Sequence, residues 1–136
     1  LWPDGAGEGA ELPLLVSQVD ADGNDIAGIR MPEVAVPLGT ATGWVFRAAS
    51  MGSPHEPVLL RGAWVPFPRT KARREATHDP RLSIAERYAS KEAYLALVKT
   101  TLQKLVEQRF LTEEDLDPQL KQASERWDWM ARPSAE

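Results

Sequence analysis

Apolar positions follow two different patterns along the chain, and the pattern changes near residue 68. All nine glycines lie between Gly5 and Gly62, and eight of the eleven prolines lie at or before Pro68. Because both residue types interrupt helices, the first half predicts turns and short strands. Residues 83–130 hold no glycine and one proline and are rich in Ala, Leu, Glu, Lys and Gln, which predicts helices. We therefore expect an α+β fold with a turn-rich N-terminal half of short β-strands and a hairpin, followed by a helical C-terminal half.

The first half contains several short apolar runs. Two of them flank the turn sequence ADGN and predict a hairpin: LPLLVSQV (12–19) and DIAGIRM (25–31). Four more follow: VAVPL (34–38), GWVFR (43–47), PVLLRG (57–62) and AWVPF (63–67). Pro37 and Pro66 interrupt two of these runs, and we expect edge strands or extended connectors there, because proline cannot donate to a central ladder. With no clearly one-sided strand, this half is expected to need partner surface.

Capping signals and one-sided apolar stripes predict the helices of the second half. Ser83 with Glu86 matches a capping box and predicts a short helix over about residues 83–89. Ser90 can cap a second helix that runs to about Arg109. Its apolar stripe comprises Tyr94, Leu95, Val98, Thr101, Leu102, Leu105, Val106 and Phe110.

A last helix is predicted near the end of the chain. Thr112 with Asp115 can cap one turn, and Asp117-Pro118 is typical of the N-cap and first position of the helix that follows. One side of this helix carries Leu116, Leu120, Ala123, Trp127 and Met130. The two long helices are expected to pack as an antiparallel pair.

Composition divides the chain into five segments. We expect a flexible terminus over 1–11, short strands and proline-rich connectors over 12–68, a basic linker over 69–82, a helical segment over 83–130 and a tail over 131–136. Residues 1–68 carry 3 basic and 8 acidic groups, whereas residues 69–136 carry 13 and 12. Within the linker, residues 69–81 hold five basic and two acidic groups, which favours a solvated connector over an anion contact.

Length and composition exclude several classes of protein. A chain of 136 residues with 43% hydrophobic residues suits one globular domain. The lack of cysteine excludes disulfides, thiolate metal sites and a cysteine nucleophile. With a net charge of −4 and no long apolar run, neither nucleic acid nor a membrane is an expected partner. No signal-peptide pattern is visible and the chain starts at Leu1, so we expect a fragment or a processed product.

The acidic stretch VDADGND (19–25) raises the question of a calcium site. An EF-hand loop needs glycine at its sixth position and a bidentate glutamate at its twelfth. A loop starting at Asp20 has Met31 at the twelfth position, and a loop with Gly23 sixth has Ile29 there. A hairpin turn is therefore favoured, because Asp, Asn and Gly suit tight turns. The candidates for a loosely held cation are Asp20, Asp22 and Asn24.

Other catalytic signals are few. The two histidines, His55 and His78, lie among loop residues without the further ligands that zinc requires. His78 with Asp79 could form a base and its orienting group, but a solvated loop histidine is the favoured interpretation. No G-x-S-x-G elbow and no P-loop occurs, and GAGEG (5–9) precedes no helix. No catalytic residue, cofactor or dedicated metal site is assigned.

Tryptophans are prominent in so small a chain. Trp127 and Trp129 are two residues apart, so both cannot lie on one face of a helix. We expect one of them to pack outside the helix pair and to mark a docking surface, because exposed tryptophan is enriched at interfaces.

Long stretches of the chain form a specific pattern: VSQVDADGNDIAGIRMPEVAVPLGTATGWVFR (16–47), WVPFPRTKARREATHDPRLSIAERYASKEAYL (64–95), RFLTEED (109–115) and RW (126–127). This pattern resembles the C-terminal region of the bacterial family of alpha/beta-hydrolase domain-containing proteins, over about residues 12–129. In that family an asparagine often follows the tryptophan of the GW pair. Here Val45 occupies that position, so no polar role is carried over to it.

The resemblance implies that the nucleophilic serine and the triad histidine lie upstream of this segment. The chain would then be the non-catalytic C-terminal portion of a larger α/β-hydrolase-type fold that acts on an ester, and its partner would be the rest of that polypeptide or a second copy. From residue type alone, Trp44 or Arg47 would lie near a substrate cleft. The alternatives are a free-standing protein-interaction module without enzymatic activity and a calcium-binding accessory domain.

Overall fold

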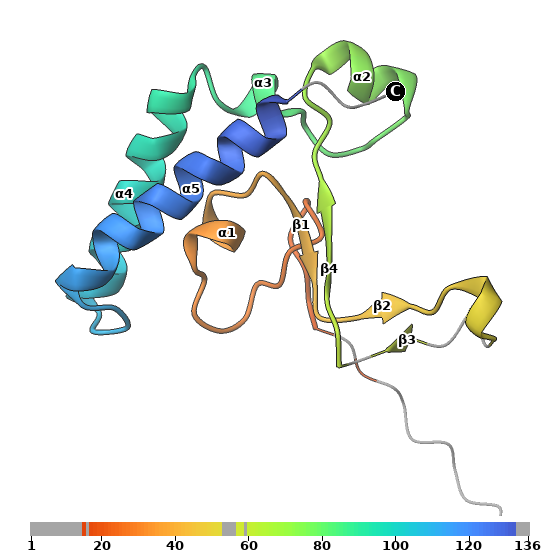
Figure 1. The fold of residues 1–136 in the computed structure, drawn as a ribbon, viewed down its shortest axis with the longest axis horizontal. Helices are drawn as coiled ribbons and strands as arrows, with labels where there is room; N and C mark the ends of the chain where they lie inside the picture. The colour runs from red at the N-terminus through yellow and green to blue at the C-terminus, as the bar shows by residue number, and fades with distance from the viewer. Residues whose placement is uncertain (1–14, 16, 53–56, 59, 133–136) are drawn as a thin grey trace, which may run out of the picture.

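The computed structural model describes residues 15, 17–52, 57–58 and 60–132 (Figure 1). The elements follow in the order α1 (Pro32–Ala35), β1 (Gly39–Thr42), β2 (Val45–Phe46), the 3₁₀ turn η1 (Ala49–Met51), β3 (Pro57–Val58), β4 (Ala63–Pro66), α2 (Lys71–Ala76), α3 (Ile84–Arg87), α4 (Lys91–Glu107), the 3₁₀ turn η2 (Glu113–Asp115) and α5 (Leu116–Ala131). The expected α+β fold, with short strands first and helices last, is confirmed. In the part of the chain that the structure describes, no helix is long and apolar enough to span a bilayer.

Helices α4 and α5 form the main packing unit and lie side by side as an antiparallel pair (Figure 1). The Ser90 Oγ accepts a hydrogen bond from the Ala93 N–H at 3.2 Å and caps α4 as predicted. Arg109 takes a left-handed conformation (φ 65°) directly after α4, which ends the helix. Most of the predicted apolar stripe of α4 points into the interior of the protein. Its residues Tyr94, Val98, Leu102 and Leu105 are buried.

Two details of the predicted helices are wrong. Phe110 lies beyond the end of α4 and is 52% exposed, because the chain turns away at Arg109. Helix α5 begins at Leu116 rather than at Pro118, with Asp115 as its N-cap residue. Both the N–H and the hydroxyl of Thr112 donate to the Asp115 carboxylate at 2.8 Å, so the predicted capping signal is present and caps the 3₁₀ turn η2, which leads directly into α5.

Within the described residues, the strands form two small antiparallel pairs. β1 pairs with β4 in a register that sets Gly39 opposite Pro66, and β2 pairs with β3 with Val45 opposite Val58. A Cβ atom on Gly39 would lie 2.7 Å from the Val65 carbonyl oxygen, so the close approach of β1 and β4 requires glycine there. β1 has the sequence GTAT, which no apolar run had marked as a strand.

Other parts of the first half depart from the expected strands. The run 34–38 begins inside α1, a single helical turn that starts with Pro32 at its first position. The predicted hairpin around the ADGN turn reduces to one bridge between Val19 and Asp25 in the described residues, while residues 12–14 and 16 of its first run lie outside them. The basic linker contains α2, a helix of six residues capped by the Thr70 hydroxyl.

The core lies where the helix pair meets β1, β4 and the chain around α3. Its buried apolar members are Val36, Leu38, Phe67, Ile84, Tyr88, Tyr94, Val98, Leu102, Ala123 and Met130. The Tyr88 hydroxyl donates to the Pro37 carbonyl at 2.8 Å and so ties α3 to the chain before β1. By contrast, β2, η1 and β3 extend away from this core as an arm (Figure 1), here called the β2–β3 arm (residues 45–52 and 57–58).

Leu102→Ala should destabilise the protein by about 2–5 kcal/mol, because it removes a fully buried side chain and leaves a cavity. The matched control is Leu97→Ala on the same helix, where the side chain is 49% exposed and the loss should be well below that. Urea unfolding followed by circular dichroism measures both. Equal losses at the two positions would contradict the described packing of α4.

Candidate functional site

The acidic turn is held together from within by the Asp20 carboxylate. Its Oδ1 accepts hydrogen bonds from the N–H groups of Asp22 and Asn24, both at 3.0 Å. Its Oδ2 accepts from the Arg30 Nη2 at 2.6 Å. Burial raises the pKa of Asp20, but these hydrogen bonds and the Arg30 charge outweigh it and leave the pKa below its ordinary value of 3.8. This carboxylate is therefore committed to its own turn.

The Asp22 carboxylate connects the turn to α3. Arg87 engages both of its oxygens in a forked ion pair, with the Nη1–Oδ2 distance at 2.8 Å. The Thr40 hydroxyl donates to the Asp22 carbonyl oxygen, which joins the turn to β1 as well. Both side chains of the ion pair are less than one fifth exposed, so the pair lies largely out of water.

The Asn24 side chain completes the edge of β1. It is wholly buried, its Oδ1 accepts from the Ala41 N–H at 2.8 Å, and its Nδ2 donates to the Gly39 carbonyl at 3.3 Å. An amide that pairs with a backbone N–H and C=O in this way acts as a short strand partner. The three residues singled out for a cation, Asp20, Asp22 and Asn24, thus face arginine and amide donors.

Two arginines, Arg81 and Arg87, pack against the ring of Phe67 beside the acidic turn. The guanidinium of Arg87 lies 4.3 Å from the Phe67 ring centroid, and that of Arg81 lies 5.2 Å from it. Arg81 also donates to the Thr40 hydroxyl at 2.8 Å and to the Val65 carbonyl at 3.1 Å. Sequence reasoning missed this cluster, because Asp22 and Arg87 lie 65 residues apart and Thr40 and Arg81 lie 41 residues apart.

The suggested pairing of His78 with Asp79 is not supported. Both Asp79 oxygens accept from Arg81, Oδ1 from Nε at 2.9 Å and Oδ2 from Nη2 at 2.6 Å. These bonds hold the pKa of Asp79 below 3.8. His78 is exposed and adopts a positive φ of 53°. His55 and the GAGEG stretch lie outside the described residues. Among the residues that are described, no cluster of three acidic or histidine side chains could hold a metal ion.

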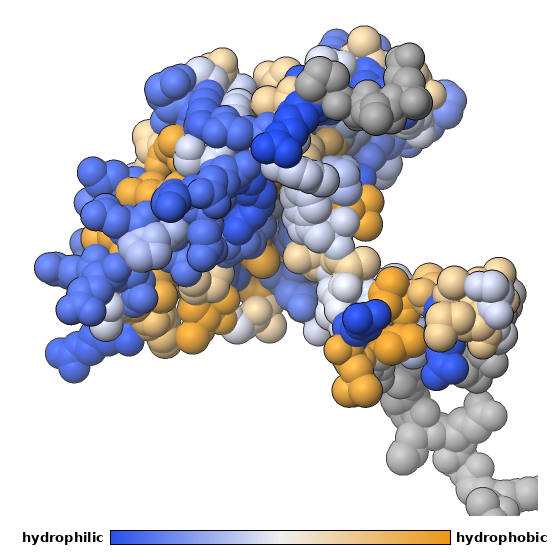
Figure 2. All heavy atoms as spheres, in the orientation of Figure 1, coloured by the Kyte–Doolittle hydropathy of each residue, from blue (hydrophilic) through white to orange (hydrophobic). Residues whose placement is uncertain are grey.

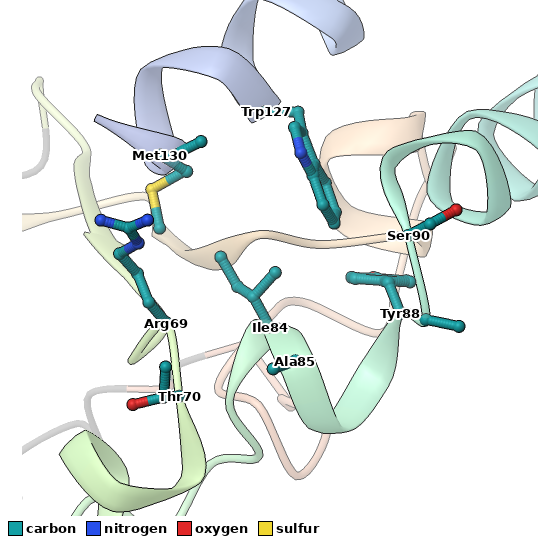
Figure 3. A pocket seen from close by; sticks show the side chains of 10 residues that line it. Arg69, Thr70, Ile84, Ala85, Tyr88, Ser90, Trp127 and Met130 are labelled. Atoms are coloured by element: carbon teal, nitrogen blue, oxygen red, sulfur yellow. The ribbon is translucent and has the colours of Figure 1, made fainter. Parts of the chain in front are cut away.

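A cavity of about 250 Å³ opens where α3 meets the C-terminal end of α5, and we call it the α3–α5 pocket (Figure 3). Its lining comes from the chain before α2, from α3 and the loop after it, and from α5: Arg69, Thr70, Ile84, Ala85, Tyr88, Ala89, Ser90, Trp127, Met130 and Ala131. Sequence reasoning did not predict this pocket, because its walls are far apart in the chain.

The four possible cleft or docking residues do not come together. Trp127 lines the α3–α5 pocket and stacks on Tyr94 with ring centroids 5.2 Å apart. Trp129 is 53% exposed and packs against Trp64 of β4 at 5.6 Å. As expected from their spacing, the two tryptophans of α5 thus point to different neighbours. Trp44 and Arg47 are exposed and lie on either side of β2, at the arm.

Breaking the Asp22–Arg87 pair should cost about 1–3 kcal/mol of stability, because a charged group would lose its partner out of water. In a double-mutant cycle, Asp22→Asn and Arg87→Gln together should cost less than the sum of the single losses. The exposed pair of Lys71 and Glu75, 3.8 Å apart, is the control and should show coupling below about 0.5 kcal/mol. Strict additivity for Asp22 and Arg87 would show that the pair is not formed.

Acid should weaken the fold through Asp79. A carboxylate whose pKa is lowered on folding stabilises the protein above its unfolded pKa, and that stability is lost as pH falls through the folded pKa. The urea midpoint should therefore decline as pH falls below about 4. The decline should be smaller in Asp79→Asn, which cannot titrate. Parallel pH profiles for the two proteins would show that the Arg81 contact does not perturb Asp79.

Comparisons with known proteins identify the family. The model of a family described as "Alpha/beta hydrolase domain" matches residues 6–121, which is most of the chain. No curated protein and no solved structure gives a significant match. The match covers the acidic turn, both strand pairs, every helix from α1 to α4 and the first six residues of α5. The chain therefore belongs to the alpha/beta-hydrolase domain family.

Proposed function

We propose that this chain is the C-terminal, non-catalytic structural portion of a serine α/β-hydrolase, which hydrolyses an ester through residues located elsewhere in the polypeptide. The proposal rests on the family match over residues 6–121. Within this stretch, the carboxylates and serine hydroxyls described above are engaged in ion pairs, turns and helix caps. In such enzymes a serine attacks the ester carbonyl, and water then releases the acyl group. The segment described here would contribute scaffold to that reaction.

The serines beside the pocket illustrate this structural use. The Ser83 hydroxyl is fully buried and donates to the Glu86 carboxylate at 2.7 Å, within the cap of α3. The Ser90 hydroxyl accepts from the Ala93 N–H and caps α4. A catalytic serine needs a base within hydrogen-bond reach and an open approach for substrate. These two serines instead stabilise helix starts, which supports a non-catalytic role for the segment.

The β2–β3 arm supports the need for a larger partner surface. Its apolar side chains and those at its base are exposed: Trp44 at 40%, Phe46 at 53%, Met51 at 75% and Leu60 at 96%. Figure 2 shows hydrophobic side chains at the surface where the arm leaves the body. A two-stranded hairpin is marginally stable in water unless another surface covers it. The rest of the hydrolase polypeptide is the partner that we propose for the arm.

The arm also favours the second candidate, a free-standing interaction module. Exposed tryptophan and phenylalanine on a projecting hairpin are typical of protein-binding surfaces. Under that alternative the arm would bind a separate protein, and the family relationship would describe ancestry without activity. The two candidates differ in whether an ester-cleaving serine belongs to the same assembly.

Labelling with a fluorophosphonate, which reacts with activated serines, tests the proposal on the native protein. Gel filtration, hydrolysis of p-nitrophenyl acyl esters and intact mass are followed across the same fractions. We expect ester cleavage to co-elute with a larger species that contains these residues. Peptide mapping should locate the label outside residues 1–136.

Two outcomes would contradict the proposal. Label on a serine within residues 1–136 would show that the segment is itself catalytic. A folded chain of 15.1 kDa that runs alone, without activity or label, would favour the interaction module.

A further inference from the structure

The α3–α5 pocket has a continuous apolar lining. Seven of its ten lining residues are apolar or aromatic, among them Ile84, Tyr88, Trp127 and Met130. Figure 3 shows Ile84 at the centre, with Met130 and Arg69 on one side and Trp127 and Tyr88 on the other. Pockets for drug-sized ligands span roughly 300–1,000 Å³. At about 250 Å³ this pocket suits a small apolar body.

The aromatic wall of the pocket is held in place from behind. Trp127 stacks on Tyr94, and its ring centroid lies 6.2 Å from that of Tyr88 in an edge contact. The Tyr88 hydroxyl is bound to the Pro37 carbonyl and does not point a free polar group at a ligand. Burial raises the pKa of Tyr88, so its phenol stays neutral. A ligand would meet a preformed apolar wall, which lowers the entropy cost of binding.

The opposite wall is also fixed by backbone contacts. The N–H groups of Ile84 and Ala85 donate to the carbonyls of Pro68 and Arg69, at 2.9 and 3.1 Å. These bonds join the start of α3 to the chain that carries Arg69. The Arg69 Nη1 donates to the Arg132 carbonyl at 3.1 Å, just after α5. The guanidinium is therefore oriented at the rim between the two helices.

Charge decides which apolar ligand fits. Among the described residues that line the pocket, Arg69 alone has a formal charge, and none of them is a carboxylate. A guanidinium has five N–H donors, and its bond to Arg132 uses one of them. A carboxylate at the rim would gain a charge-assisted hydrogen bond, whereas an ammonium group would be repelled. A neutral head group would gain less.

From the apolar lining and the Arg69 guanidinium, we infer that the α3–α5 pocket binds a small carboxylic acid with an apolar body. The hydrocarbon body would lie against Ile84 and Trp127, and the carboxylate would lie at Arg69. The inference goes beyond the proposed function, because binding at this pocket requires no ester cleavage. It is independent of where the catalytic serine lies.

Calorimetric titration with 4-tert-butylbenzoate and its neutral amide tests the inference. The native protein is used, together with any polypeptide that co-elutes with it in gel filtration. We expect saturable binding of the acid that is at least about tenfold tighter than that of the amide at low salt, since a charge-assisted bond is stronger than a neutral one. Arg69→Gln should reduce this ratio to about one, and Arg69→Lys should restore part of it.

Matched variants separate charge from shape. Arg73→Gln removes an exposed arginine of α2 that does not line the pocket, and it should keep the wild-type ratio. Ala85 and Ala131 line the pocket on α3 and α5, and both side chains are exposed. Replacing either alanine by tryptophan (Ala85→Trp or Ala131→Trp) should fill the pocket and abolish binding of both probes. Circular dichroism confirms that each variant is folded, and either filling variant suffices if the other does not fold.

Three results would overturn the inference. The first is no saturable binding of the acid to the folded wild-type protein. The second is equal affinity for the acid and the amide. The third is a preference for the acid that persists in Arg69→Gln or in a folded variant with the pocket filled. None of these results bears on where the fluorophosphonate label falls, so the proposed hydrolase function would stand or fall separately.

Discussion

The forked ion pair between Asp22 and Arg87 is the contact on which the arrangement of the two halves depends. The turn-rich half has strands of only two or four residues and few buried side chains of its own, so it cannot build a separate core. Arg87 attaches its acidic turn to α3 across 65 residues of sequence. Arg126 of α5 makes a similar link to Glu33 of α1 at 2.8 Å. Two acidic side chains of the first half, Asp22 and Glu33, thus pair with arginines of the second half.

This role changes how the acidic turn should be understood. A glycine-containing loop with three oxygen-bearing side chains resembles a cation site in composition. Here the charge of its two carboxylates is already balanced by Arg30 and Arg87. A cation would have to displace these guanidinium groups, and each carboxylate would lose charge-assisted hydrogen bonds. The turn is best understood as a joint that orients β1 and α3 toward each other.

The β2–β3 arm and the α3–α5 pocket represent two different kinds of surface. The arm is apolar, narrow and projecting, and its two-residue strands are too short to be stable without a covering surface. The pocket is concave, lies against the main core and is lined by rings that are already packed. The arm therefore suits a protein partner, whereas the pocket suits a small molecule. Both features are consistent with the structural role that we propose for this segment in a hydrolase.

The helical half could be predicted from the sequence because its signals act over a few residues. The caps at Ser90 and Thr112 and the stripe from Tyr94 to Leu105 each depend on spacings of three or four positions. The acidic turn was likewise predictable as a turn, since its hydrogen bonds span two to four residues.

The tertiary structure alone decided the rest. Strand β1 has no apolar pattern, and it exists because Asn24 and β4 satisfy its backbone groups. The pocket joins Arg69 to α5, more than fifty positions further along the chain. The partners of Asp22 and Trp129 are as distant. Local propensity carries no information about which distant groups meet, because that choice is made by burial and by the pairing of charges when the chain folds.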